Sequence, residues 1–439
     1  MKAKYMPLLN NKYSLSFFCL LCFSLIEFSA IVSISVGPIF GGGKVLTHLS
    51  DTAFWSVIMY ELAYYFSLIV LLHVSLWLVW IALARRIELT KMLYTLGFVF
   101  ALAGVYFLSA GVYTQSAAGK NVVAIYGVSS TYLFAWLCFA MAVGVLISGS
   151  RFLTRKYIIE KVALAAVLAG VCFLPFSSLP NVNGERSTQP NVIILGVDSL
   201  RHDLVHSDLF QDTMPATAAQ FETGVQYTNT FTSVARTFVS WSSILTGMAP
   251  LESGIRVNLQ QVSTELREQS LAYKLKKMGY KTAYATDERR FSNIEEDWGF
   301  DTVIGPKAGV ADFIWGEFAD IPLLNVFRLM PIGEHVFPYL AFNRAVKTTY
   351  LPDQFSQKIG DLLTSHDQSE PLFLATHLCM GHWPYVKGPA TSDSEISHPY
   401  AYPPYLNALK IADTQVADVF DTLKSEGYLD NAIVMVFSD

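Results

Sequence analysis

Long apolar segments at the start of this 439-residue chain constrain its fold more than any other feature. A helix needs about 20 apolar residues to cross a bilayer. Five segments approach or exceed that length: Ser14–Val36, Ala53–Ala84, Met92–Tyr113, Val122–Ser148 and Val162–Ser178. The sequence therefore predicts a membrane domain of five transmembrane helices over residues 1–180. The Pro- and Gly-bearing stretch 181–190 is the expected linker to a second domain.

Lysine and arginine residues predict the orientation of these helices. Ten of them fall on one side, in the N-terminal segment and around residues 85–91 and 151–161, and only Lys44 and Lys120 fall on the other. The excess of positive charge marks the cytoplasmic side. We therefore expect a multi-pass protein of the cytoplasmic membrane, with its N-terminus in the cytoplasm and everything after Leu179 extracytoplasmic.

A few polar and sulfur-bearing side chains lie inside the apolar segments. We expect Glu27, Glu61 and His73 to lie near an interface or to bond to neighbouring helices, because ionisable groups in a membrane need protein or water around them. The alternative is a groove for a lipid headgroup. Cys19 and Cys22 form a CxxC without a second pair nearby. We interpret these two cysteines as small apolar residues, not a metal site.

The second part of the chain has a different composition. Residues 181–439 hold 31 acidic and 19 basic side chains, whereas residues 1–180 hold five acidic and twelve basic ones. Nucleic acid is not expected as a partner of an acidic domain, because phosphate backbones need clustered Lys and Arg. No feature of the sequence indicates an oligomeric state.

Alternating strand and helix patterns run through residues 191–439. The expected strands are 191–197, 282–286, 371–378 and 432–437, and the expected helices are 214–223, 237–246, 265–278, 353–364 and 406–425. Short β-branched runs separated by amphipathic helices indicate an α/β domain with a mostly parallel central sheet.

Three polar residues of this part predict a site. Asp198 and Asp439 each follow a predicted strand, and Thr237 opens a predicted helix. Ligands of open α/β sheets bind at the carboxyl ends of the strands, and free N–H groups at a helix start favour an anion. Carboxylate and hydroxyl oxygens suit a hard divalent cation, which would activate the hydroxyl as a nucleophile. We predict that Asp198, Thr237 and Asp439 bind a metal ion.

Several motifs in residues 190–439 resemble the sulfatase branch of the alkaline phosphatase superfamily. They are, in order, NVIILGVDSLR, TFVSWSSILTG, LKKMGYKTAYATD followed by WGFD, HLCMGHWPY, and the closing IADTQVADVFDTLKSEGYLDNAIVMVFSD. The resemblance implies that Asp198 and Asp439 are metal ligands and that Thr237 occupies the position of the nucleophile. It also implies that His382, and less directly His377, contact the substrate.

The chain departs from the sulfatase pattern at four points. Thr237 cannot become the formylglycine of true sulfatases, and it is similar to the Thr nucleophile of phosphoethanolamine and phosphoglycerol transferases (the lipoteichoic-acid-synthase-like enzymes). Trp241 stands where sulfatases carry an Arg, for which Arg236 is the candidate replacement, and Ser199 stands for a second Asp. The family pattern continues beyond Asp439 with His-Gly and a further His ligand, so we expect this sequence to be C-terminally incomplete.

The sequence thus favours a membrane-anchored, metal-dependent enzyme that transfers or hydrolyses a phospho- or sulfo-ester through Thr237. A phospholipid is the expected headgroup donor, because the predicted spans place the domain beside lipid. Two alternatives are a true sulfatase, which hydrolyses sulfuric esters, and an inactive sulfatase fold that acts as a membrane sensor or scaffold. An oxygen-rich site suits Mg, Mn or Ca, and added His ligands would favour Zn.

Overall fold

The computed structural model describes residues 13–25, 27, 52–84, 90–148, 186–289, 292, 294–305, 320–336, 350–383, 385 and 401–439. The chain divides into two compact units. The first comprises Met1–Phe176 and Val310–Leu340, and the second comprises Ser177–Gly309 and Ala341–Asp439. The segment 310–340 therefore belongs with the membrane helices although it lies late in the sequence.

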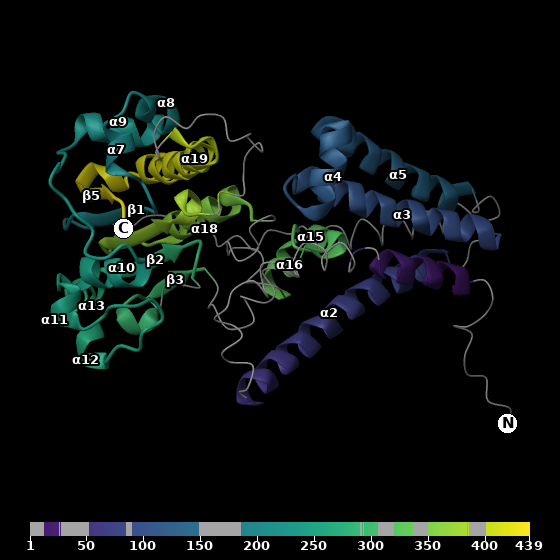
Figure 1. The fold of residues 1–439 in the computed structure, drawn as a ribbon, viewed down its shortest axis with the longest axis horizontal. Coiled ribbons are helices and arrows are strands. Elements are labelled where there is room, and N and C mark those ends of the chain that lie inside the picture. The colour runs from purple at the N-terminus through teal and green to yellow at the C-terminus, as the bar shows by residue number, and fades with distance from the viewer. Residues whose placement is uncertain are drawn as a thin grey trace. The chain divides into compact units, whose positions relative to one another are not determined.

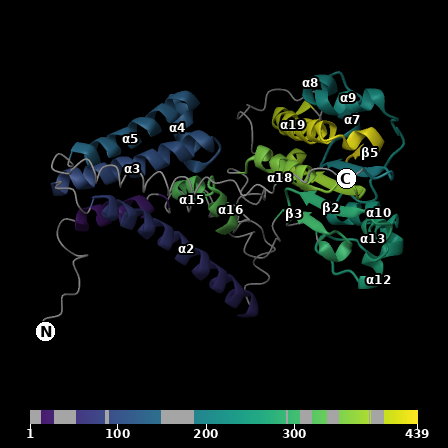
Figure 2. The ribbon, with the colours of Figure 1, turned by 180° about the vertical axis from the view of Figure 1, so that it is seen from behind.

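The first unit is helical, and Figure 2 shows its helices from behind. Its long helices are α2 (Thr52–Ala84), α3 (Lys91–Val112) and α5 (Val128–Ser148), and α4 (Ala117–Tyr126) is shorter. In the described part of this unit, three stretches are long and apolar enough to cross a membrane: Phe66–Leu83, Lys91–Val112 and Val128–Leu146. Tyr13–Leu25 is a shorter apolar helix. The predicted span Val162–Ser178 and the end of Ser14–Val36 lie outside the described residues.

One predicted span begins in the wrong place. We expected a single helix over Val122–Ser148, but the chain breaks at Gly127, between α4 and α5. Gly127 has a φ of 75°, a left-handed conformation that glycine adopts without strain. The span therefore starts at Val128, and Val122 packs in α4 against the neighbouring helix α3.

The late segment of the first unit contains α15 (Pro322–Phe327) and α16 (Pro331–Val336). Asp320 Oδ2 accepts a hydrogen bond of 2.6 Å from the Ala117 amide at the start of α4, and Asn325 donates to Ser109 Oγ at 3.2 Å. The Leu323 amide donates to Glu27, whose carboxylate lies 2.8 Å from His73 Nε2. The hydrogen bonds expected for Glu27 and His73 are thus confirmed.

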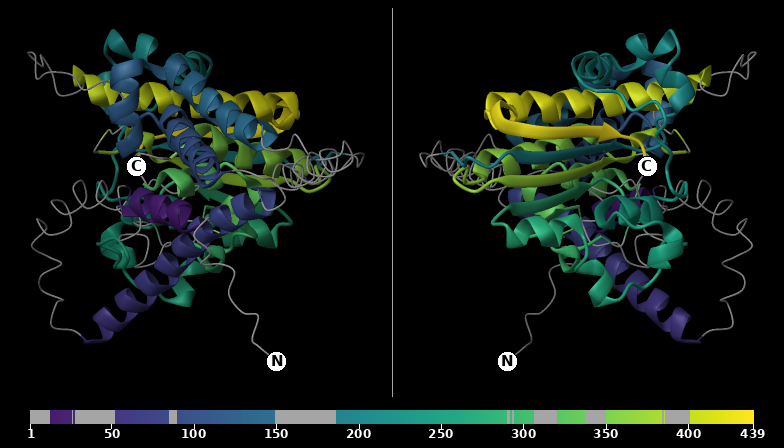
Figure 3. Two further views of the ribbon diagram at one scale, coloured as in Figure 1. Left: turned by 90° about the vertical axis from the view of Figure 1, so that its right-hand side faces the viewer. Right: turned by 90° about the vertical axis from the view of Figure 1, so that its left-hand side faces the viewer.

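The second unit contains a five-stranded sheet, with the strand order β3-β2-β4-β1-β5. The strands are β1 (Asn191–Val197), β2 (Lys281–Thr286), β3 (Thr302–Ile304), β4 (Leu372–Leu378) and β5 (Ala432–Phe437). All neighbouring pairs are parallel, and Figure 3 shows the strands running in one direction. The α/β fold is confirmed, and its sheet is wholly parallel in the described part. Four strands match the prediction closely, whereas β3 was not predicted.

Helices cover both faces of this sheet. Alternate residues of β1, such as Ile193 and Leu195, pack with helices α18 (Pro352–Ser365) and α19 (Pro403–Ser425). Ile194 points to the other face and packs with α10 (Thr237–Thr246) and α13 (Leu271–Lys277). Figure 1 shows α18 and α19 on one side of the sheet and α10 and α13 on the other. The fully apolar central strands follow from burial on both faces.

Short helices complete this unit. On the face of α19 lie α7 (His202–Val205), α8 (Leu209–Thr213) and α9 (Pro215–Thr223), and α11 (Pro250–Ser253) follows α10. The helix expected over 265–278 is wrong in one respect, because it is split into α12 (Thr264–Arg267) and α13. Ser270 causes the split: its side chain accepts from the Tyr273 amide and so caps a new helix start.

Candidate active site

The carboxyl ends of four neighbouring strands carry polar residues into one region. Asp198 follows β1, Asp439 lies two residues after β5, and Asp287 follows β2. His377 is the penultimate residue of β4, and Cys379 follows that strand. Because the strands are parallel neighbours, these side chains gather at one edge of the sheet, where α/β folds bind ligands.

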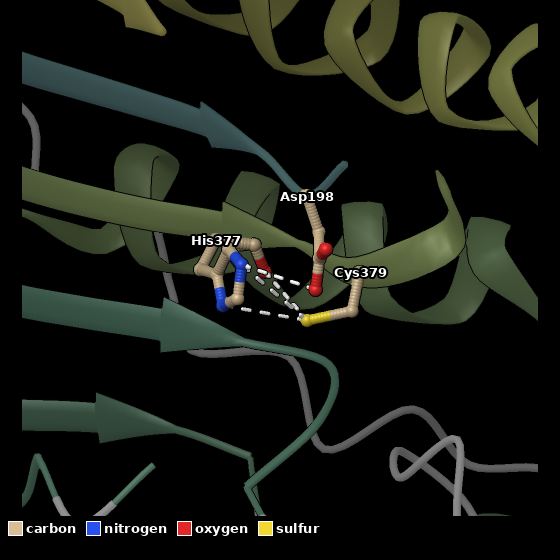
Figure 4. A group of neighbouring side chains, drawn as sticks. All are labelled: Asp198, His377 and Cys379. Atoms are coloured by element: carbon tan, nitrogen blue, oxygen red, sulfur yellow. Dashed lines mark hydrogen bonds and ion pairs between the residues drawn. The ribbon is translucent and has the colours of Figure 1, made fainter. Parts of the chain in front are cut away.

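His377 lies between the two predicted carboxylate ligands. Its Nε2 is 3.6 Å from Asp198 Oδ2 and 3.2 Å from Asp439 Oδ2. The His377 side chain is fully buried, and the Asp198 and Asp439 side chains are 8% and 3% exposed. Figure 4 shows Asp198, His377 and Cys379 pointing toward one another. The structure therefore joins Asp198, Asp439 and His377 in one buried cluster.

The backbone after β1 is shaped to hold Asp198. Ser199 has a φ of 59°, in the left-handed region, and its Oγ donates to Asp198 Oδ1 at 2.7 Å. Its carbonyl accepts from the Tyr405 hydroxyl at 2.8 Å. A side chain on Gly381 would clash, because its Cβ would lie 2.3 Å from the Asp198 carbonyl. Ser199 thus fixes the Asp198 carboxylate by a hydrogen bond.

Charges in the cluster depend strongly on one another. Burial raises the pKa of Asp198, and the nearby charge of Asp439 raises it further. Burial would lower the pKa of His377, but the carboxylates of Asp439 and Asp198 outweigh it and raise the pKa to about 9. Burial would raise the pKa of Asp439, but the charge and hydrogen bond of His377 lower it overall. A positive charge is therefore favoured between the two carboxylates.

Helix α10 begins at Thr237, which is half-buried. One turn later, the Trp241 ring packs against His377 at 5.3 Å between ring centroids. Trp241 also lies so close to Gly196 of β1 that a Cβ there would be 2.6 Å from Trp241 Cζ2. The Phe238 amide in the first turn donates to Asn258 Oδ1 at 3.2 Å. These contacts seat the first half of α10 over β1 and β4, near their carboxyl ends.

The other predicted site residues lie at the surface. His382 is exposed, and its Nδ1 is 2.5 Å from the Trp383 carbonyl. Arg236 precedes α10 and is exposed. Within the described ranges, its side chain makes no hydrogen bond or ion pair with the buried cluster.

A comparison with known protein families identifies the family of this domain. The profile of the sulfatase family matches residues 190–439, which is the whole of the region with the parallel sheet. The chain belongs to the sulfatase family. This confirms the resemblance drawn from the motifs, within the alkaline phosphatase superfamily.

Some solved structures are more distantly similar to this sulfatase-family chain. A protein of the alkaline phosphatase superfamily from Vibrio parahaemolyticus is 18% identical, with a TM-score of 0.35 over 63% of this chain and 62% of that chain. The lipoteichoic acid synthase LtaP from Listeria monocytogenes is 18% identical, with a TM-score of 0.33 over 60% of this chain and 59% of that chain. This chain thus spans less than two thirds of either structure.

Two buried residues of the sulfatase-family domain were not predicted as part of the site. Asp287 Oδ1 accepts from the Cys379 amide at 2.8 Å, and Asp287 Oδ2 accepts from the Tyr350 hydroxyl at 2.7 Å. Cys379 Sγ lies 3.4 Å from His377 Nδ1. Asp287 closes the motif LKKMGYKTAYATD and follows a predicted strand, so the rule that selected Asp198 and Asp439 could also have selected it.

The cluster fits the divalent cation expected for this family. Asp439 Oδ1 is buried, and no hydrogen-bond partner for it exists among the described residues. Two desolvated carboxylates beside an imidazole are costly unless a positive charge accompanies them. Asp198, His377 and Cys379 offer ligand atoms within 4.8 Å of one another. Asp198 and His377 are thus suitable ligands, and the buried, unpartnered oxygen of Asp439 makes that carboxylate a further candidate.

Proposed function

We propose that this chain is a membrane-anchored, metal-dependent enzyme that transfers or hydrolyses a phospho- or sulfo-ester through Thr237. The observation that carries the proposal is the buried cluster of Asp198, His377 and Asp439, beside the beginning of α10. Membership of the sulfatase family supports ester chemistry at this edge of the sheet.

Thr237 is the proposed nucleophile. Its Oγ1 forms a bond to the phosphorus of the donor, the bond from phosphorus to the leaving alcohol breaks, and the Thr237 proton is lost as that alcohol gains one. Water or an acceptor alcohol then attacks phospho-Thr237 and restores the hydroxyl. N–H groups of the first turn of α10 and the positive end of the helix dipole favour the anionic group.

Other residues have the remaining roles in the proposed reaction. Asp198 and Asp439 would hold the cation, Ser199 orients Asp198, and His382 would serve the leaving group or acceptor. Arg236 contacts the charged headgroup. When bound, a divalent cation lowers the pKa of the attacking hydroxyl and offsets charge on the transferred group.

A phospholipid headgroup donor fits the membrane half of the chain. Among the residues that the structure describes, three helices are long and apolar enough to cross a membrane. With the N-terminus in the cytoplasm, five spans would place the catalytic domain on the outer side, where it meets the headgroups of that leaflet.

Turnover by the detergent-solubilised full chain, loaded with a divalent cation, tests this proposal. The substrates are vesicles of phosphatidylethanolamine or phosphatidylglycerol, an aryl phosphodiester and an aryl sulfate. We expect diacylglycerol release that falls by about a thousandfold or more in Thr237→Ala and less in Thr237→Ser, which keeps a hydroxyl.

Two outcomes would contradict the proposal. Aryl sulfate hydrolysis that survives Thr237→Ala would exclude Thr237 as nucleophile and favour a true sulfatase. Absence of turnover on every substrate, with the cation bound, would favour the inactive sensor or scaffold.

A further inference from the structure

Cys379 lies against the buried cluster, in a place that packing alone does not require. Its Sγ is 3.8 Å from His377 Nε2, the atom that also faces both carboxylates. The residue is 1% exposed, and Figure 4 shows its sulfur pointing toward His377 and Asp198. A buried cysteine more often acts as a small apolar residue, but this one has charged neighbours.

The backbone fixes this position of the sulfur. Cys379 opens the short 3-10 helix η4 (Cys379–Gly381) directly after β4, and its amide donates to buried Asp287 at 2.8 Å. The neighbouring strand β1 is followed by Asp198, whose amide donates to the Leu378 carbonyl at 2.9 Å. Neighbouring strand ends therefore hold the thiol and the first carboxylate in register.

Three ligand atoms lie around His377 Nε2 at distances near those between the ligands of one tetrahedral ion. These distances are 3.2 Å to Asp439 Oδ2, 3.6 Å to Asp198 Oδ2 and 3.8 Å to Cys379 Sγ. Ligand atoms at zinc's usual bond lengths lie roughly 3.3–3.6 Å apart around a tetrahedron. The ligand atoms of Asp198, His377 and Cys379 all lie within 4.8 Å of one another, and Asp439 approaches the group through its contact with His377.

A separate observation also points to an ion here. Asp439 Oδ1 is buried, and the described residues supply it with no hydrogen-bond partner. A bound cation would satisfy this oxygen.

We propose that Asp198, His377, Cys379 and Asp439 together bind a thiophilic divalent ion of the zinc class. The ion replaces the Cys379 thiol proton and the Nε2 proton of the His377 imidazolium, and both protons pass to solvent. Thiolate and imidazole ligands favour Zn²⁺ over Mg²⁺, Mn²⁺ or Ca²⁺, which prefer oxygen. This inference rests on the metal site of the proposed function and names the class of its metal.

Cadmium, a thiophilic probe for zinc sites, gives a readout that does not depend on activity. The full chain in detergent is stripped with a chelator and titrated with Cd²⁺, and the ultraviolet charge-transfer band of a cadmium–thiolate bond is followed. We expect this band in the wild-type chain, its loss in Cys379→Ser, and zinc affinity at least about tenfold weaker in that variant. The matched control replaces Cys19 and Cys22, the CxxC pair, with Ala and should keep the band.

Competition in the wild-type chain keeps the test valid if Cys379→Ser fails to fold. We expect Zn²⁺ to remove the cadmium band at stoichiometric concentration and Mg²⁺ or Mn²⁺ not to do so in large excess. A band that persists in Cys379→Ser, or cation binding without any band in the wild type, would overturn the inference.

The two proposals can fail separately. A cadmium band in a chain that turns over no ester would support the metal site and contradict the proposed function. Full turnover in Cys379→Ser with Mg²⁺ as the cation, together with no cadmium band in the wild-type chain, would support the proposed function. It would contradict Cys379 as a thiolate ligand.

Discussion

Asp301, the last residue of the WGFD motif, shows what one carboxylate does for the fold. Its Oδ2 accepts from the Thr282 amide at 3.0 Å and from the Thr282 hydroxyl at 3.1 Å, and its Oδ1 lies 2.7 Å from Lys276 Nζ. Thr282 belongs to β2 and Lys276 to α13. Asp301 therefore joins strand β2 to helix α13, which precedes it in the chain.

Asp301 predicts a pH-dependent contribution to stability. Burial alone would raise the pKa of Asp301, but the Lys276 ammonium and the two hydrogen bonds from Thr282 outweigh it and lower that pKa. A lowered pKa in the folded state stabilises the domain above the unfolded value of about 4, and this contribution is lost as the pH falls through the folded value.

We expect Asp301→Asn to lower the free energy of unfolding of the α/β domain by about 1 kcal/mol at pH 7, because the charge-assisted bonds are lost. The difference from wild type should shrink as the pH falls below 4. Urea unfolding between pH 3 and pH 7 measures it, with Lys276→Ala as the control that removes only the half-exposed partner. A difference that is constant with pH would contradict this account.

Residues of the site were predictable where they obey a positional rule. Asp198 and Asp439 follow strands, and the structure brings them together around His377. Cys379 was not predicted, because nothing in a single cysteine indicates which side chains the neighbouring strand will bring beside it. That information lies in the pairing of β1 with β4.

At the scale of elements, the contact between α10 and β1 decides where Thr237 lies. Trp241 fills the space over Gly196 and contacts Tyr284 and Phe437 as well as His377. Any side chain at position 196 would push the helix, and Thr237 with it, away from the strand ends. Glycine is needed here because of this close approach of helix to strand.

Gly196→Ala should destabilise the α/β domain by about 1–3 kcal/mol, because the added methyl overpacks the space that Trp241 fills. In the double variant Gly196→Ala/Trp241→Phe, the smaller ring leaves room for the methyl, so the two effects should be less than additive. Urea unfolding of the two single variants and the double variant measures this coupling. Strict additivity would show that the methyl and the indole do not meet.

The hydrophobic pattern of the sequence predicted most of the helices and strands, and local chemistry explains the exceptions. Strands β1, β2, β4 and β5 and helices α18 and α19 lie close to their predicted ranges. Hydropathy does not fall at Gly127, so periodicity missed the break between α4 and α5. Strand β3 has three residues, too few to show an alternating pattern.

At the scale of the whole molecule, two separate stretches of the chain form the first unit. Residues 310–340 belong to the membrane unit although the sulfatase-family sequence surrounds them. Asp320 acts there as a cap for α4 from 203 positions away, because its carboxylate accepts from the Ala117 amide and from the Asn325 side chain. Sequence patterns do not reveal such a cap, since the partners are distant in the chain.

Asp320→Ala should loosen the first turn of α4, because an N-terminal cap contributes about 1 kcal/mol. We expect faster amide hydrogen exchange at Ala117 in the detergent-solubilised chain and a smaller change in Asp320→Asn, which keeps one acceptor oxygen. Exchange at the Leu93 amide, which Thr90 caps in α3, serves as the internal control. Equal exchange at Ala117 in all three chains would contradict the capping role.

The central claim is that Thr237 carries the transferred group. Mass spectrometry of the peptide that contains Thr237 tests it most directly, after the full chain in detergent has been incubated with cation and phospholipid vesicles and quenched in acid. We predict a phospho-linked adduct on Thr237, absent in Thr237→Ala, with a mass that identifies the headgroup. Product formed without any adduct, at the same rate in Thr237→Ala, would contradict the account.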